Sequence, residues 1–489
     1  MSRFHAVNPA TGAQLDGAFK ITTEADIDVI VRAAHAAFQK YAALSGARRG
    51  AFLRAVADEI EADSAKIVER ANLESALGTA RLNGEIGRTC AQLRMFAEIA
   101  EEGTWVDARI DRGDPERQPM PKPDVRSMLV PLGPVAVFGA SNFPLAFSVA
   151  GGDTAAALAA GCPVVVKAHP AHPGTSELVY DAVRRAITVS GLQKGVFGIV
   201  FDDGHDAGVA LVKHPLIRAV GFTGSLAGGD ALRKIAAERP EPIPVYAEMG
   251  SINPQFLLPN AVRKRGAEIA AGLHASFTLG TGQYCTNPGV VLLPAGAEGD
   301  ALLDELAART RETRAGTMLT AGICSAYGQG LHRLRAGGAT LVAEGPEGSE
   351  GTGRASVWEA ELTSFTDPAL LEEVFGPCTL VLRYQDADQL REFVPNLQGQ
   401  LTASIHGQAG ELGDWAWLAR LLQNKAGRVI INQFPTGVEV TDAMVHGGPY
   451  PATSDGRSTS VGGRAIERFA RLVAWQNFPQ ELLPKALRD

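Results

Sequence analysis

The sequence predicts an α/β fold in which parallel strands alternate with helices. Short runs rich in Val, Ile and Phe recur through the middle of the chain, at residues 135–139, 163–167, 195–200, 219–223 and 244–247. The stretches between them, such as 176–188 and 227–237, carry Ala, Leu and Arg at helical spacing. Apolar runs of this length that alternate with helices indicate crossover connections and a parallel sheet covered on both faces.

The first hundred residues are expected to be mainly helical, over 24–38, 47–62 and 88–101. A polar, proline-rich stretch at 111–124 follows, and then an alternating run at 125–130. Connections of this composition usually run over the surface, so the run is expected to be an exposed strand.

The most apolar long stretch, 145–160, contains Asp153 and several glycines, which favours a buried helix over a membrane span. After residue 250 the pattern restarts with a helix near 264–277, a glycine-rich loop and a strand at 289–293. This restart predicts a second α/β domain, as the length of 489 residues also does.

The composition is that of a folded globular protein, with 45% hydrophobic and 20% charged residues. The net charge of −8 argues against binding to nucleic acid or to an anionic membrane. The five cysteines are scattered and form no CxxC pair, so neither a disulfide framework nor a metal site is expected. The first residues lack a secretory pattern, which makes a reducing cytoplasm the expected location.

Cys285 is the first candidate for chemistry, in the segment GTGQYCTNPG at 280–289. A thiol in a turn between a helix and a strand can face a crevice, and backbone amides of the turn can donate to an oxyanion. The alternative is that Cys285 is a small buried hydrophobic residue, as most free cysteines are.

Four further positions follow predicted strands, where parallel sheets bind ligands. Glu248 suits a general base, or is a solvated loop carboxylate. Asn142 can donate to an oxyanion, or caps a helix. Lys167 can bind a ribose or phosphate, or lies at the surface. The segment 222–225 (FTGS) opens a helix whose N-terminus can receive a phosphate, although neither common phosphate-binding fingerprint is present.

Together these segments resemble the aldehyde dehydrogenase superfamily. The similarity rests on six ordered motifs, which are Asn142-Phe-Pro, Val165-Val-Lys167, Phe222-Thr-Gly-Ser225, Glu248-Met-Gly250, Gly282-Gln-Tyr-Cys285 and Glu373-Val-Phe-Gly-Pro377. The segments Asn8-Pro-Ala-Thr-Gly12 and Val429-Ile-Ile-Asn432 also fit, so the resemblance spans nearly the whole chain.

The resemblance implies a Rossmann-like cofactor domain (1–111 and 133–250), an α/β catalytic domain (251–440) and a small β oligomerisation element (112–132 and 468–489). It also implies a homodimer or homotetramer. Cys285 resembles the nucleophile, Asn142 the oxyanion donor and Glu248 the base that activates water. The residues that resemble cofactor ligands are Lys167, His169, Gly224, Ser225, Glu373 and Phe375.

Two departures from the family pattern concern the base and the cofactor. Ser251 stands where a second glycine is usual. NAD-preferring relatives tend to carry a glutamate three residues after the lysine, and here that position is Pro170. A carboxylate there would repel a 2′-phosphate, and Lys167 or His169 could attract one. We therefore predict that NADP is used well, with NAD also possible, while His169 and His172 can equally be inert loop residues.

Three segments resemble a subgroup of the family that acts on 2,5-dioxopentanoate (α-ketoglutaric semialdehyde), namely 167–177, 247–254 and 446–462. By family position the substrate tunnel is expected to be lined by Phe143, Phe147, Tyr284, Thr286 and Phe434. Arg457 is one candidate for binding a distal carboxylate, against the alternative of a surface arginine. NADP-linked oxidation of aliphatic or other semialdehydes is the second interpretation. A coenzyme A-acylating enzyme and an inactive structural homologue are more distant alternatives. The first would share Cys285 but usually lacks a glutamate at the position of Glu248, and the presence of Cys285, Glu248 and Asn142 speaks against the second.

Overall fold

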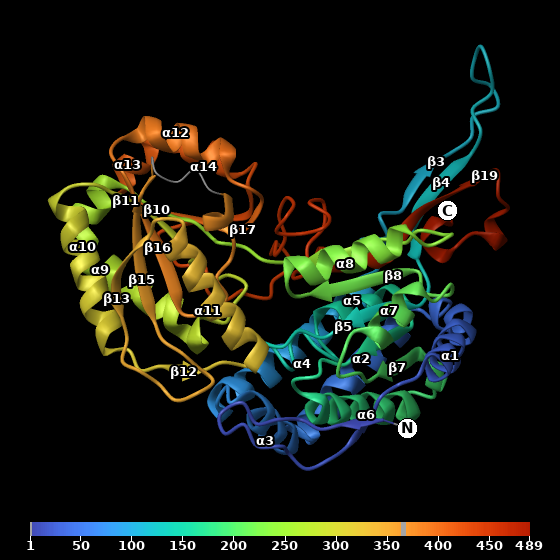
Figure 1. Ribbon diagram of the computed structural model, residues 1–489. Coiled ribbons are helices and arrows are strands. Elements are labelled where there is room, and N and C mark those ends of the chain that lie inside the picture. Colours follow the sequence, from blue (N-terminus) through green and yellow to red (C-terminus); the bar gives the residue numbers. More distant parts are fainter. Residues whose placement is uncertain (1, 363–367) are drawn as a thin grey trace.

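The computed structural model describes residues 2–362 and 368–489. Two α/β lobes lie side by side, and an arm that contains β3, β4 and β19 projects from one of them (Figure 1). Each lobe is built around its own sheet, and the arm forms a third sheet. The predicted α/β class is confirmed by these sheets and their covering helices.

The first sheet has five parallel strands in the order β7-β6-β5-β8-β9. Their bounds are Val135–Phe138 (β5), Val164–Lys167 (β6), Phe197–Val200 (β7), Ala219–Thr223 (β8) and Val245–Glu248 (β9). All five apolar runs predicted from the sequence are therefore strands. The order changes direction beside β5, because β6 and β7 lie on one side of it and β8 and β9 on the other.

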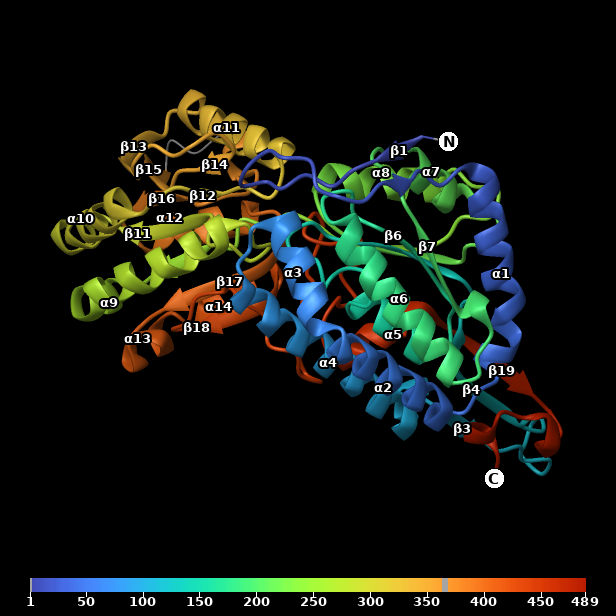
Figure 2. The same cartoon turned by 90° about the horizontal axis from the view of Figure 1, so that it is seen from below.

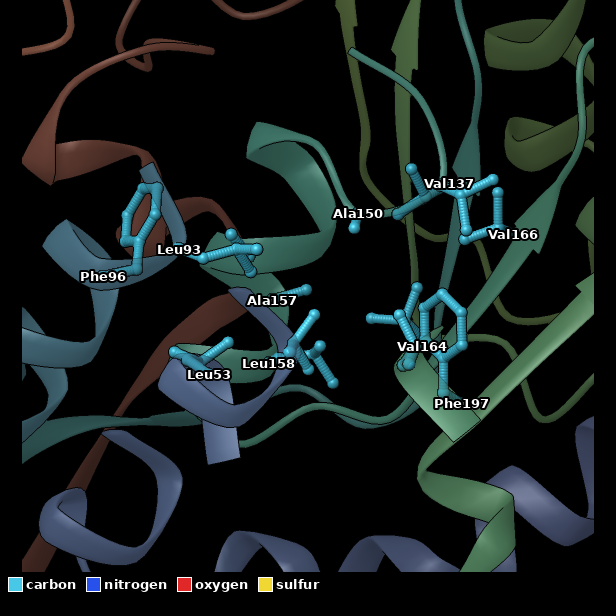
Figure 3. Packing of buried hydrophobic residues seen from close by; sticks show 14 of the residues in the cluster. Leu53, Leu93, Phe96, Val137, Ala150, Ala157, Leu158, Val164, Val166 and Phe197 are labelled. Atoms are coloured by element: carbon cyan, nitrogen blue, oxygen red, sulfur yellow. The ribbon is translucent and has the colours of Figure 1, made fainter. Parts of the chain in front are cut away.

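Helices cover both faces of this sheet. They are α1 (Glu24–Ala42), α2 (Gly46–Ala62), α3 (Ser64–Ser75), α4 (Thr79–Glu102), α5 (Gly152–Ala160), α6 (Pro173–Val189), α7 (Asp206–Lys213) and α8 (Leu226–Ala237). In the view from below, α2 and α4 run side by side (Figure 2). Figure 3 shows how α5 joins them to the sheet, with Leu158 between Leu53 of α2 and Val164 of β6.

Helix α5 is shorter than the expected helix at 145–160. It begins at Gly152, and the residues before it form turns. A Cβ on Gly151 would lie 2.4 Å from the carbonyl oxygen of Ala146, so this close approach requires glycine. Asp153 accepts a hydrogen bond from Arg468 at 2.6 Å, which pairs the one charge of the helix. Within residues 2–362 and 368–489, no helix has the length and apolar character of a membrane span.

The second sheet has seven strands in the order β13-β15-β16-β11-β10-β17-β18, and all neighbours are parallel except β13 and β15. The strands are Gln255–Leu257 (β10), Val290–Pro294 (β11), Thr340–Glu344 (β13), Ser356–Glu361 (β15), Cys378–Tyr384 (β16), Gln400–His406 (β17) and Ala426–Ile431 (β18). The expected strand near 289–293 is β11.

Helices of the second lobe are α9 (Pro259–Thr278), α10 (Ala297–Glu312), α11 (Ala321–Ala336), α12 (Ala387–Asn396), α13 (Ala409–Asp414) and α14 (Ala416–Leu422). The expected helix at 264–277 lies within α9. Two strand pairs are short, β1 (Arg3–Phe4) with β2 (Phe19–Lys20) and β12 (Gly316–Thr317) with β14 (Thr352–Gly353).

The arm is a three-stranded antiparallel sheet of β19 (Ala470–Gln476), β4 (Val125–Pro131) and β3 (Arg109–Asp111), in that order. The expectation that residues 125–130 form an exposed strand is corrected, because β4 is central and paired on both sides. Arg126 of β4 is only 2% exposed and forms ion pairs with Asp124 and Asp489. Strand β3 begins before residue 112, the expected start of the oligomerisation element. The proposed domain boundaries stay a prediction.

Candidate active site

The candidate residues gather where the two lobes meet. Glu248 is the last residue of β9, and Cys285 lies in the turn before β11. The segment 441–469 returns between them, since Glu248 forms an antiparallel bridge with Thr453 and the amide of Met249 donates to the carbonyl of Ala452 at 2.8 Å. This returning segment brings a third functional group, His446, into the site.

Cys285, His446 and Glu248 form a contiguous cluster. The Cys285 Sγ lies 3.3 Å from His446 Nε2, which lies 3.1 Å from Glu248 Oε2. Ser460 Oγ donates to the same carboxylate oxygen at 3.1 Å. The side chain of His446 is 0% exposed and that of Glu248 is 2% exposed, so water hardly screens these contacts.

The charges of this cluster set one another's protonation. Burial raises the pKa of the Cys285 thiol well above its ordinary value, and the neighbouring Glu248 carboxylate raises it further. Burial also acts to raise the pKa of Glu248, but the His446 imidazole and the bond from Ser460 outweigh it, and the pKa is lowered. The cluster therefore rests with a neutral thiol beside an ionised carboxylate.

Asn142 is placed by contacts with both lobes. Its Nδ2 donates to the carbonyl of Gln283 at 3.1 Å, beside the cysteine turn, and its own carbonyl accepts from Arg81 at 2.6 Å. Asn142 is 8% exposed. The side-chain amide is thus held next to Cys285, and its second N–H remains for another acceptor.

The side-chain amide of Asn253, which is fully buried, stabilises the cysteine turn. Its Nδ2 donates to the carbonyl oxygens of Cys285 and Asn287, each at 2.9 Å. Ser251 donates to Gln400 Oε1 at 2.9 Å and lies within hydrogen-bonding distance of Asn253. The serine that replaces a usual glycine therefore belongs to the network that supports the nucleophile turn.

The candidate cofactor residues lie along the carboxyl edge of the first sheet. Lys167 ends β6 and donates to the carbonyl of Asp202 at 3.2 Å, while burial lowers the pKa of its ammonium group. Ser225 caps α8 through a bond from the amide of Gly228, and Gly224 precedes it. This edge next to β5 is where doubly wound sheets bind ligands.

The two neighbouring histidines have different environments. His172 is fully buried and bridges the carbonyl of Ala140 (2.9 Å) and Ser176 (3.3 Å), which gives it a structural role. His169 is half-buried, and its Nδ1 accepts from the amide of Ala171 at 3.1 Å. Burial holds the pKa of His169 well below its usual value, so in this structure its ring is neutral.

Glu373 and Phe375 come from the other lobe, ahead of β16. A Cβ on Gly250 would lie 2.7 Å from Glu373 Oε2, so the carboxyl group lies against the loop after β9. Burial raises the pKa of Glu373 to about 8. Lys167 carries hydrogen-bond donors and Glu373 a carboxyl group, and both groups can bind ribose hydroxyls. Phe375 is half-buried and follows Glu373 by two residues.

Most expected substrate residues form one aromatic cluster. The Phe143 ring lies 5.2 Å from that of Phe147 and 5.5 Å from that of Tyr284, both edge-on. Thr286 is 1% exposed in the cysteine turn. Phe434 does not join the cluster, because its ring packs 4.6 Å from that of His406 and against Gly272 of α9.

Arg457 lies away from these residues. It is exposed in a turn, where its amide donates to Asp455. This position favours the alternative of a surface arginine.

His446 was missed by sequence reasoning, although it begins one of the segments quoted for the subgroup resemblance. It follows no predicted strand, and it reaches the site only because 441–469 folds back across both lobes. The ligand atoms of Glu248, Cys285 and His446 lie within 4.8 Å of one another, so the cluster also has the donors of a metal site, which was not expected.

Comparison with known proteins shows which family this chain resembles. Residues 1–469 match the model of the aldehyde dehydrogenase family. The chain is 49% identical to alpha-ketoglutaric semialdehyde dehydrogenase 2 of Azospirillum brasilense, over 99% of this chain and 93% of that protein. It is 46% identical to alpha-ketoglutaric semialdehyde dehydrogenase of Acinetobacter baylyi, over 96% of this chain and 90% of that protein.

Solved structures share the fold. The aldehyde dehydrogenase of Bacillus cereus in complex with NAD⁺ gives a TM-score of 0.81 at 24% identity, covering 97% of this chain and 93% of that one. PnpE, also bound to nicotinamide adenine dinucleotide, gives 0.83 at 23% identity, with 97% and 94% covered. The family resemblance predicted from the motifs is confirmed, and the chain belongs to the aldehyde dehydrogenase family of oxidoreductases that act on aldehydes.

Proposed function

We propose that this protein oxidises 2,5-dioxopentanoate to 2-oxoglutarate through a thioester on Cys285. The observation that carries the chemistry is the unbroken contact from Cys285 Sγ through His446 to Glu248. The substrate is supported by the two alpha-ketoglutaric semialdehyde dehydrogenases that are 49% and 46% identical to this chain.

The first step requires the thiol proton to leave. His446 Nε2 lies between Sγ and Oε2, so the imidazole can carry this proton while the Glu248 carboxylate stabilises the resulting cation. The thiolate then attacks the aldehyde carbon and forms a tetrahedral thiohemiacetal. We expect the free N–H of Asn142 and the backbone amide of Cys285 to stabilise its oxyanion, and each such donor typically contributes about 3 kcal/mol.

A nicotinamide cofactor, which Lys167, Ser225 and Glu373 would hold, would supply the acceptor for the hydride that leaves the aldehyde carbon. The acyl group then remains on Sγ as a thioester. Glu248 Oε1 is buried and has no hydrogen-bond partner among the described residues, so it can hold the water that hydrolyses the thioester once the side chains around it move to admit that water. Hydrolysis releases the acid and returns the proton to the cluster.

We further propose that NADP is used well. The proline at position 170 leaves no carboxylate there to repel a 2′-phosphate, and Lys167 at the end of β6 can attract one. His169 is neutral in this structure and can contribute only a hydrogen bond. The two similar solved structures contain NAD, which supports a nicotinamide dinucleotide as the cofactor here, either NAD or NADP. Initial rates with both cofactors test this proposal, and strict NAD preference would overturn it.

An assembly of two or four copies is the expected state. β19 lies at one edge of the arm sheet, where Leu472 is 66% exposed. An edge strand with exposed apolar side chains is suited to pairing with another sheet. Sedimentation analysis would determine the number of copies.

The proposed activity is tested by cofactor reduction in a panel of 2,5-dioxopentanoate, succinic semialdehyde, hexanal and betaine aldehyde with NADP. We expect the highest kcat/KM for 2,5-dioxopentanoate and an acyl adduct on Cys285 by mass spectrometry. A preference for hexanal would support the second candidate, an aliphatic aldehyde dehydrogenase, which the aromatic cluster of Phe143, Phe147 and Tyr284 favours.

A further inference from the structure

Helix α4 presents two arginines and a glutamate to the aromatic cluster, at Arg81, Glu85 and Arg88. This spacing puts the three side chains on one face of the helix. The Arg88 guanidinium lies over the rings of Phe143 (5.7 Å) and Phe147 (5.3 Å). The side chains that line the expected substrate tunnel are therefore backed by a row of charged groups.

Arg88 is the member of this row with the most unused donors. Its Nε and Nη2 atoms are inaccessible and have no hydrogen-bond partner in residues 2–362 and 368–489. Arg81, in contrast, donates to the carbonyl of Asn142. Oε1 of Glu85 accepts from the amides of Leu145 and Ala146, and its Oε2 has no hydrogen-bond partner among the described residues, so Glu85 does not use the donors of Arg88.

Unused donors on a buried guanidinium are costly, because water no longer solvates them. Burial lowers the pKa of Arg88 from its ordinary value, but arginine stays charged in proteins. A carboxylate is the group that best matches the planar fork of a guanidinium, with two parallel hydrogen bonds.

Arg88 also lies at a suitable place relative to the reacting thiol. The Phe147 ring is 5.3 Å from the Arg88 guanidinium and 6.4 Å from the ring of His446, which contacts Cys285 Sγ. Phe147 thus lies beside both Arg88 and the cluster that holds the thiol. In 2,5-dioxopentanoate, four carbon–carbon bonds, about 5 Å when extended, separate the aldehyde carbon from the carboxylate.

We propose that Arg88 binds the distal carboxylate of the substrate and selects oxo-acid aldehydes over uncharged ones. The inference rests on the proposed function, and it assigns to α4 the role that the sequence had suggested for Arg457. Phe143 and Phe147 hold the guanidinium in place, and its unpartnered Nε and Nη2 atoms receive the carboxylate when the side chains that cover them move to admit the substrate.

The test compares Arg88→Met, Arg88→Lys and the exposed control Arg457→Met on 2,5-dioxopentanoate and on pentanal, an uncharged aldehyde of equal length. We expect Arg88→Met to lower kcat/KM for the oxo acid by about 100-fold and for pentanal by less than about threefold. Arg88→Lys should recover part of the loss, since it restores the charge without the fork. Arg457→Met should match the wild type on both substrates.

The pentanal rate also reports folding, because it depends on the same nucleophile. Equal losses on both substrates, or no loss on the oxo acid, would overturn the assignment of Arg88 while leaving the proposed function intact. A selective loss in Arg457→Met instead would move the carboxylate site to the loop. If the wild type itself fails to oxidise 2,5-dioxopentanoate, the proposed function fails first, and this inference fails with it.

Discussion

The nucleophile cluster (Cys285, His446 and Glu248) and the cofactor edge (the carboxyl edge of the first sheet, with Lys167 and Ser225) are built differently. In the cluster, Cys285, His446 and Glu248 contact one another, and these contacts change the pKa values of the Cys285 thiol and the Glu248 carboxyl group. Along the cofactor edge, Lys167 and Ser225 bind nearby backbone atoms and do not contact each other. Substitutions in the cluster should therefore change chemistry and protonation, whereas substitutions at the edge should change binding alone.

The largest expected effect comes from removing the nucleophile. Cys285→Ala should lower turnover by at least about 10⁴-fold, because no other thiol lies in the cluster. Cys324→Ala is the matched control, since Cys324 is also partly exposed but lies on α11. Cofactor reduction is measured for both variants. Retained turnover in Cys285→Ala would place the chemistry elsewhere.

Glu248→Gln should separate the two halves of the reaction. The amide cannot deprotonate water, so we expect a burst of cofactor reduction followed by steady turnover about 10²- to 10³-fold below the wild type. Rapid mixing with stoichiometric enzyme measures both phases. Glu347→Gln is an exposed control that should behave as the wild type. Normal steady-state turnover in Glu248→Gln would remove this residue from the hydrolytic step.

His446→Gln should slow the burst itself, by about 100-fold, because the imidazole carries the thiol proton before attack. The glutamine retains a donor toward Glu248, so the fold of the loop is preserved. His205→Gln, at an exposed position, is the matched substitution. A normal burst in His446→Gln would mean that Glu248 takes the thiol proton without it.

Cys285, Glu248 and Asn142 became candidates because their motifs are local and each follows a predicted strand or helix, and the family resemblance then favoured functional roles for them. The five strands of the first sheet were predictable for the same reason, since buried parallel strands are continuous apolar runs. His446 and Arg88 were missed because their roles arise from contacts across the chain. Nothing in the local pattern of α4 indicates that Arg88 faces an aromatic cluster from residues 143–147, and nothing near residue 446 indicates contact with residue 285.

The pH dependence of Cys285 alkylation tests whether the protonation of the thiol depends on Glu248 in the nucleophile cluster. Burial and Glu248 raise the pKa of Cys285, so alkylation by iodoacetamide should still accelerate as the pH rises through 9. Glu248→Gln removes a negative charge and should lower that pKa, which increases the alkylation rate at pH 8 by about tenfold even though turnover falls. Mass spectrometry of Cys285 over time measures the alkylation rate at each pH. An unchanged rate profile would show that the two groups are not coupled.

The smallest expected effect is at the cofactor edge. Pro170→Glu should raise the ratio of kcat/KM for NAD to that for NADP by about tenfold, because a carboxylate repels the 2′-phosphate and accepts hydrogen bonds from the free ribose hydroxyls. The burst amplitude and the alkylation profile of Cys285 should stay at wild-type values, since Pro170 follows β6 and has no contact with the cluster among the described residues. Ala171→Glu places the same charge one residue further and serves as the control. If Pro170→Glu altered the reactivity of Cys285, the two regions would not be energetically separate, and the contrast between chemistry in one and binding in the other would not hold.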